Sequence, residues 1–160
     1  MIPSLVLTAG ALIVLAAFLR RRYLVVTVYG RSMLPSYRGG DRLLVRRTGL
    51  DKLRPGSVVV FRSPDAPTLA EVAAFSDDPV TGVLPDERLL IKRLAAVPGD
   101  PAPVDRVPAL AALGSPVVPP GMVVVLGDNP AVSHDSRAYG YLPATHVIGV
   151  ALRRLSVVQA

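Results

Sequence analysis

The stretch that decides the fold is "RLLIKRLAAVPGD", residues 88–100, where a short apolar run carries one lysine and ends at proline and glycine. Runs of this length, rich in apolar and β-branched residues and bounded by Gly or Pro, are typical of β-strands. Similar runs occupy residues 23–30, 42–47, 56–63, 122–128 and 146–155. Past residue 22 only residues 69–75 carry a helical period. The sequence therefore predicts a mainly β domain, a closed or half-closed barrel.

Lys92, inside that first run, is unusual because the chain uses arginine almost everywhere else. Of 18 basic residues only Lys52, in a polar turn, and Lys92 are lysines. An ammonium can lose its proton when it is buried, whereas a guanidinium cannot. Lys92 is therefore a candidate general base. The same run also suits an edge-strand lysine whose stem lies on the core and whose head reaches water.

The N-terminal segment differs from the rest of the 160-residue chain. No charged side chain occurs before Arg20, and the segment is almost continuously apolar. This length predicts one transmembrane helix over residues 1–22, including the basic flank Arg20, Arg21 and Arg22. A cleaved signal would need a basic start, and a buried core helix would show a polar face.

Residues 23–160 are then expected to form a single β-rich domain with two surface insertions. The first, at about 63–87, is acidic and rich in proline, and the second, at about 101–120, is rich in Pro and Ala. Neither insertion is long enough to be a second domain.

Composition excludes several kinds of site. The chain has no cysteine, which rules out disulfides and thiolate chemistry, and nothing in it predicts a metal or cofactor. The net charge of +6 suits contact with an anionic lipid bilayer. Aromatic residues make up only 5% and do not alternate with basic clusters, so we expect no nucleic-acid partner.

Ser32 is the candidate nucleophile, in "YGRSMLPS", residues 29–36. A serine on a tight turn can present its hydroxyl beside free backbone N–H groups, although an ordinary turn has the same pattern. His134 and His146 are the histidines available as its base: the first precedes Asp135, and the second opens the last predicted strand as a surface histidine. Lys92 is the remaining choice, which would make a Ser–Lys dyad.

A third stretch, "LGDNPAVSHDSRAYGYLP" at residues 126–143, follows an apolar strand and is dense in hydrogen-bonding side chains, which also suits a polar hairpin loop. With "GRSMLP", "GDRLLVRR" and "IKRLAAVPGD", it makes the chain resemble the type I signal peptidases, membrane-bound Ser–Lys serine proteases. The four motifs occur in the order of that family and span residues 30–143.

The resemblance implies a signal-peptidase-like or LexA-like β-barrel that cuts signal or leader segments from exported preproteins after small residues. By motif position, Ser32 is the nucleophile and Lys92 the general base. Ser133 would orient the lysine amine, and Asp135 and Arg137 would form an ion pair near the site. The remaining motif positions are Arg93 and Asp128, taken as structural, and Gly30, where some relatives carry a serine. The backbone N–H of Ser32 would serve the oxyanion hole.

The resemblance also implies a location in the cell membrane, with one span and an extracytoplasmic catalytic domain. We expect the protein to be a monomer. The arginines at 20–22 favour the opposite orientation by the positive-inside tendency, and we follow the family because exported substrates lie outside. Met33 and Leu34 would then face the lipid interface. Two alternatives remain open: a maturation peptidase dedicated to one partner protein, and a catalytically silent, membrane-tethered domain that binds peptides.

Overall fold

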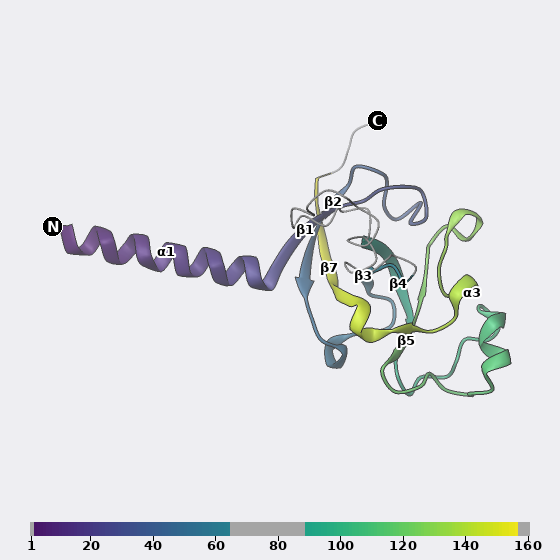
Figure 1. Cartoon of the computed structure of the whole chain (residues 1–160). Coiled ribbons are helices and arrows are strands. Elements are labelled where there is room, and N and C mark those ends of the chain that lie inside the picture. Colours follow the sequence, from purple (N-terminus) through teal and green to yellow (C-terminus); the bar gives the residue numbers. More distant parts are fainter. Residues whose placement is uncertain (1, 65–88, 157–160) are drawn as a thin grey trace, which may run out of the picture.

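The computed structural model describes residues 2–64 and 89–156 and is mainly β, as the sequence predicts. A helix leads into a seven-stranded antiparallel sheet whose order is β1-β2-β7-β3-β4-β5-β6 (Figure 1). The elements are α1 (Ile2–Arg22), β1 (Tyr23–Thr27), β2 (Arg42–Arg47), β3 (Val58–Arg62), β4 (Leu89–Ala96), β5 (Met122–Leu126), α3 (Ser136–Tyr139), β6 (Leu142–Pro143) and β7 (Val147–Ser156).

The sheet is curled rather than closed. Strands β1 and β6 form its two edges within the described residues, so the closed form of the predicted barrel is wrong and the half-closed form is nearer. Register shifts interrupt the pairing of β2 with β7, β3 with β7 and β4 with β5. Such bulges bend strands and increase their twist, which gives the sheet its curl.

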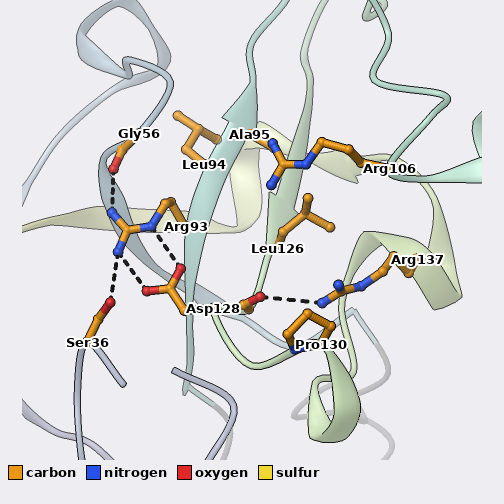
Figure 2. A pocket seen from close by; sticks show the side chains of 11 residues that line it. Ser36, Gly56, Arg93, Leu94, Ala95, Arg106, Leu126, Asp128, Pro130 and Arg137 are labelled. Atoms are coloured by element: carbon orange, nitrogen blue, oxygen red, sulfur yellow. Dashed lines mark hydrogen bonds and ion pairs between the residues drawn. The ribbon is translucent and has the colours of Figure 1, made fainter. Parts of the chain in front are cut away.

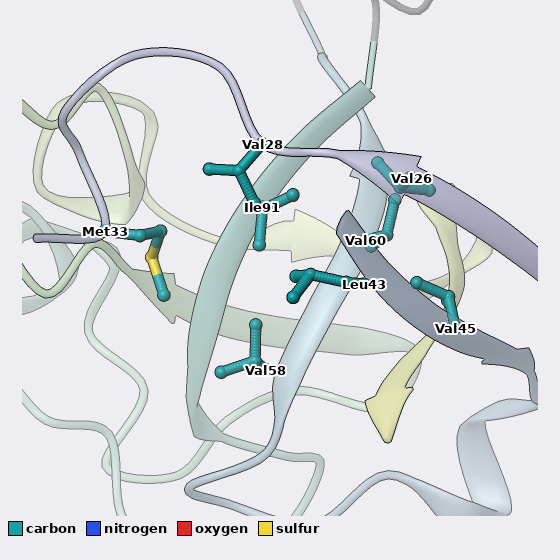
Figure 3. Close-up of a cluster of buried hydrophobic side chains, with 8 residues drawn as sticks. All are labelled: Val26, Val28, Met33, Leu43, Val45, Val58, Val60 and Ile91. Carbon is teal, nitrogen blue, oxygen red and sulfur yellow. The ribbon is translucent and has the colours of Figure 1, made fainter. Parts of the chain in front are cut away.

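Strand β3 lies at the centre of the core because both of its faces are buried. Val58 and Val60 join one apolar cluster, and Val59 and Phe61 join another. Figure 3 shows the first cluster, which also contains Val26, Val28, Met33, Leu43, Val45 and Ile91. This continuous burial explains why the strand reads as an unbroken apolar run.

Met33 belongs to the first cluster and is only 2% exposed. The expectation that it faces the lipid interface is therefore wrong. Its side chain instead packs into the core and so fixes the turn that carries Ser32.

The segment between β4 and β5 is an ordered excursion. Pro101 pairs with Val117 at its neck, and a 3₁₀ turn spans Pro108–Leu113. Val107, Leu110 and Val118 are buried against β5 in a third cluster. The first insertion, apart from its first two residues, and the helical period at 69–75 lie outside the described residues.

The predicted N-terminal helix is present as α1, which projects away from the β-domain and continues directly into β1 (Figure 1). Its described apolar side chains are exposed: Leu12, Ile13, Val14, Leu15, Phe18 and Leu19 are each between 46% and 70% exposed. Within residues 2–64 and 89–156, no helix has the combined length and apolar content needed to cross a membrane.

Candidate active site

Ser32 lies on a loop between β1 and β2 that is closed at its base by backbone hydrogen bonds. The N–H of Val28 donates to the carbonyl of Asp41 at 2.8 Å, and the N–H of Gly40 donates to that of Val28 at 2.9 Å. Gly30 begins the turn with φ +76°, a conformation that glycine adopts without strain. This geometry accounts for the glycine two places before Ser32.

The far side of the same loop is fixed to the last strand. Asp41 is fully buried and forms an ion pair with Arg154 at 3.2 Å. Arg154 also donates to the backbone carbonyl of Ser36 and stacks over the ring of Tyr37 at 5.1 Å. The loop carrying Ser32 is therefore held from both ends, which limits its freedom to move the hydroxyl.

The loop brings Ser32 to Lys92, which comes from β4 and lies 60 residues further along the chain. The Nζ atom of Lys92 is 2.8 Å from the Oγ atom of Ser32. Lys92 is 3% exposed, so the edge-strand interpretation with a solvated head is wrong. In register it stands opposite Val59 of the central strand, where neighbouring strands exclude water.

Burial lowers the pKa of Lys92 below its ordinary value, because the ammonium loses the water that stabilises its charge. The nearby carboxylate of Asp135 opposes this shift, and the guanidinium of Arg137 adds to it. The result is an amine that gives up its proton more readily than an exposed lysine, beside a hydroxyl that needs a base.

Asp135 is the fully buried acceptor that organises the last of the four motifs, residues 126–143. We call this stretch the last motif. Its Oδ2 accepts from the hydroxyl of Ser133 at 2.6 Å and from the N–H of Gly127 at 2.8 Å. Arg137 pairs with it through Nε at 3.0 Å and Nη2 at 2.5 Å, and its N–H caps the carboxylate at 3.1 Å. Burial alone would raise the pKa of Asp135, but the hydrogen bonds from Arg137, Gly127 and Ser133 outweigh it and lower the pKa.

Gly127 lies between the turn that carries Ser32 and the side chain of Ser133. A Cβ atom at this position would lie 2.1 Å from the Oγ of Ser133 and 2.7 Å from the carbonyl oxygen of Ser32. The N–H of Asn129 donates to that carbonyl at 2.9 Å, and its side chain donates to the carbonyl of Arg31 at 3.1 Å. Only a glycine allows the last motif to approach the turn that carries Ser32 this closely.

Arg93 and Asp128 form a second ion pair next to the first. Successive strand residues point to opposite faces, so Arg93 points away from its neighbour Lys92. Its Nη2 is 2.6 Å from the Oδ2 of Asp128, and its Nη1 donates to the carbonyl of Gly56 at 2.8 Å (Figure 2). The pair joins β4 to the segment after β5.

The structure places Ser32 beside Lys92, Ser133 and Arg137 on Asp135, and Arg93 on Asp128, while Gly30 begins the turn that carries Ser32. One detail differs from expectation. Among the described residues, Lys92 Nζ has a single hydrogen-bond partner, Ser32, and the hydroxyl of Ser133 donates to Asp135. The orientation of the lysine by Ser133 stays a prediction.

The histidines lie outside this arrangement. The ring of His134 contacts that of Tyr139 at 5.5 Å, and His146 Nδ1 is 3.3 Å from the carbonyl of Arg62. Sequence reasoning missed Gly127, Asn129 and Arg154 as positioning residues. The first two stood inside the quoted polar motif, but nothing in the pattern separated them from ordinary turn residues.

The chain is similar in sequence to several known proteins. The family described as "Signal peptidase, peptidase S26" matches residues 1–109 and 102–155. The chain is similar to the probable signal peptidase I-1 of Synechocystis, with 31% identity over 77% of this chain and 66% of that protein. It is 32% identical to signal peptidase IB of Staphylococcus aureus strain COL over 77% of this chain and 72% of that protein.

A third relative is the mitochondrial ATP-independent inner membrane protease subunit 1a of Arabidopsis thaliana, 32% identical over 84% of this chain and 72% of that protein. The match to the signal peptidase I of Mycobacterium tuberculosis covers 86% of this chain and 65% of that protein. The chain therefore spans just under two thirds of the length of the Synechocystis and Mycobacterium proteins.

Proposed function

The chain belongs to the signal peptidase family, peptidase S26, and from that premise we propose that it is a membrane-bound serine endopeptidase that removes signal or leader segments from exported preproteins. Ser32 is the nucleophile and Lys92 the general base. One observation carries the proposal: the amine of a buried lysine is 2.8 Å from the hydroxyl of a serine on a fixed turn.

In the proposed reaction, the neutral amine of Lys92 takes the proton of Ser32 as the Oγ atom attacks the carbonyl carbon of the scissile bond. The carbonyl oxygen becomes an oxyanion near the backbone N–H of Ser32, which has no acceptor among the described residues. The resulting ammonium then protonates the leaving amine. Water hydrolyses the acyl-enzyme by the same exchange of protons, which regenerates the serine.

The hydroxyl of Ser133 supports this assignment through its position. It donates its proton to Asp135, so its oxygen keeps lone pairs that can accept from the lysine amine. The carboxylate of Asp135 and the guanidinium of Arg137 place opposite charges near the amine, and neither becomes a partner in the reaction. Both reacting groups come from one chain, so the proposed reaction needs no residue from a second subunit.

The test uses the full chain purified in non-ionic detergent and a preprotein with a small residue before the expected cut. We expect cleavage after that small residue, read by N-terminal sequencing of the product, because the family resemblance implies small side chains there. A serine-directed acylating inhibitor is expected to modify Ser32 and no other serine, mapped by peptide mass. Matched substrate with a bulky residue at the same position serves as the control.

Two other outcomes separate the alternatives. Acylation of Ser32 without cleavage of general preproteins would favour a maturation peptidase dedicated to one partner. Absence of both acylation and cleavage would contradict the enzyme assignment and would leave a silent peptide-binding domain.

We also propose that α1 attaches the enzyme to the membrane, with the catalytic domain on the extracytoplasmic face. The exposed apolar side chains from Leu12 to Leu19 support this, because a patch of that kind on a projecting helix needs a non-aqueous partner. The arginines at 20–22 then lie at the membrane surface, where anionic headgroups attract them.

Expression in a bacterial host tests this attachment. We expect the full chain to sediment with membranes and resist carbonate extraction, whereas a chain that starts at Tyr23 stays in the supernatant. Protease added to intact spheroplasts should digest the β-domain. Protection of the domain would contradict the outward orientation, and carbonate release of the full chain would contradict the attachment.

A further inference from the structure

A pocket of about 650 Å³ lies beside the catalytic residues without including them. Arg93, Leu94 and Ala95 of β4 are among the residues that line it, and neither Ser32 nor Lys92 is (Figure 2). Its volume is within the range of pockets that hold small molecules. It shares Gly127 and Arg137 with the catalytic site, so the two are separated by little more than one backbone segment.

Three arginines line this pocket, and two of them already have charged partners. Arg93 pairs with Asp128, and Arg137 pairs with the buried Asp135. Each pair is neutral as a unit. The Nη1 group of Arg137 has no acceptor among the described residues, so its two N–H donors remain available on the pocket side.

Arg106 is the third arginine and comes from the excursion between β4 and β5. It is exposed, its backbone N–H donates to the carbonyl of Pro103 at 3.1 Å, and its guanidinium has no ion-pair or hydrogen-bond partner in the described part of the chain. In Figure 2 its guanidinium lies beside Ala95 and Leu126, within the pocket. One positive charge and a full set of five N–H donors are therefore uncompensated there.

We propose that this pocket binds a small organic anion, whose carboxylate or phosphate group is held by Arg106 and the Nη1 group of Arg137. Planar guanidinium groups recognise such oxyanions through paired hydrogen bonds. The rest of the lining is partly apolar, with Leu94, Leu126 and Pro130, so the ligand carries an apolar part next to its charged group.

The same oxyanion chemistry occurs in soluble metabolites and in lipid headgroups. The position of the pocket favours a soluble ligand. Most of its lining comes from β4, the excursion, the end of β5 with the residues after it, and α3, with Ser36 and Gly56 added from the loops before β2 and β3. Helix α3 lies at the opposite end of the β-domain from α1 (Figure 1). The pocket wall at α3 is therefore far from the helix proposed to bind the membrane.

Isothermal titration calorimetry of the full chain in non-ionic detergent tests the site directly, without a cleavage assay and so independently of the proposed protease activity. The probes are phenyl phosphate, inorganic phosphate and uncharged phenol. We expect one saturable site for phenyl phosphate, weaker binding of inorganic phosphate, and none of phenol. Arg106→Gln should weaken phenyl phosphate binding at least about tenfold, because it removes charge-assisted hydrogen bonds.

Two controls make the result decisive. Arg47→Gln removes an exposed arginine from β2, away from the pocket, and should bind phenyl phosphate like the wild type. Arg106→Lys keeps the charge but loses the planar guanidinium, so its affinity for phenyl phosphate should lie between those of the wild type and Arg106→Gln. No saturable binding, or equal binding by the wild type and Arg106→Gln, would overturn the proposal. Displacement of phenyl phosphate by phosphatidylglycerol vesicles, and not by phosphatidylcholine vesicles, would identify a headgroup as the source.

Discussion

Replacing Lys92 with methionine is expected to reduce preprotein cleavage by at least about 10³-fold while making the folded protein more stable at neutral pH. The loss of activity follows from the missing base, since removal of a nucleophile or its base in a serine protease has effects of this size or larger. Ser32→Ala should reduce cleavage as severely. The double variant should be no worse than either, because the two groups act as one unit.

The gain in stability comes from the removal of a buried ionisable group. The pKa of Lys92 in the folded protein is below its ordinary value of 10.5, so the unfolded chain binds more protons between these two values. Folding stability therefore rises with pH across that interval, and the buried amine costs stability below it. A methionine of similar length fills the same space without a charge to desolvate.

Thermal unfolding from pH 6 to pH 10 measures this difference. The excess stability of Lys92→Met over the wild type should be largest at the lowest pH and should shrink as the pH rises. Lys52→Met removes the other lysine, in an exposed turn, and should change neither cleavage nor unfolding. A Lys92→Met protein that folds and still cuts at the wild-type rate would eliminate Lys92 as the base.

The strands could be predicted because each shows a local apolar run, and each of the six predicted runs coincides with a strand to within a few residues. Ser32 and Lys92 could be selected as candidates because Lys92 is a rare lysine within one of these runs and because both fall in motifs that resemble a known family. Strand β6 escaped prediction because Leu142 and Pro143 are too short a pair to show any period. The four-residue helix α3 escaped for the same reason, although Asp135 caps it as an acceptor for the N–H of Arg137.

What the sequence could not reveal depends on contacts between distant segments. Met33 was expected near lipid because the local sequence around Ser32 does not indicate whether an apolar side chain points to the core or to the surface. In the folded chain, residues of strands β1 to β4 bury it. The pocket likewise needs Arg106 from the excursion beside Arg137 from the last motif, which no periodicity relates. The number of donors that converge on Asp135 is another property of the folded chain alone.

Replacing Asp135 with alanine is expected to destabilise the fold by about 3 kcal/mol. The carboxylate accepts hydrogen bonds from Ser133, Gly127 and Arg137, and the N–H of Gly127 is buried without another acceptor among the described residues. Removal leaves these donors unsatisfied next to a guanidinium without its counter-charge. For a domain of this size the midpoint of thermal unfolding should fall by about 6 to 12 °C.

The pH dependence of this effect distinguishes a charged acceptor from simple loss of packing. Because the pKa of Asp135 is lowered in the folded protein, its contribution is complete above its ordinary value of 3.8 and is lost as pH falls through the lowered value. The difference between the wild type and Asp135→Ala should therefore be constant near neutral pH and shrink in acid. A packing defect would give the same difference at every pH.

Asp105→Ala is the matched control, because Asp105 is exposed in the excursion and has no partner in the described part of the chain. It should unfold like the wild type. If Asp135→Ala also unfolds like the wild type, the hydrogen bonds to the carboxylate do not stabilise the last motif. If it is destabilised as expected, cleavage should fall even at temperatures where it is folded, because Ser133 and Gly127 lose the acceptor that positions them beside Ser32 and Lys92.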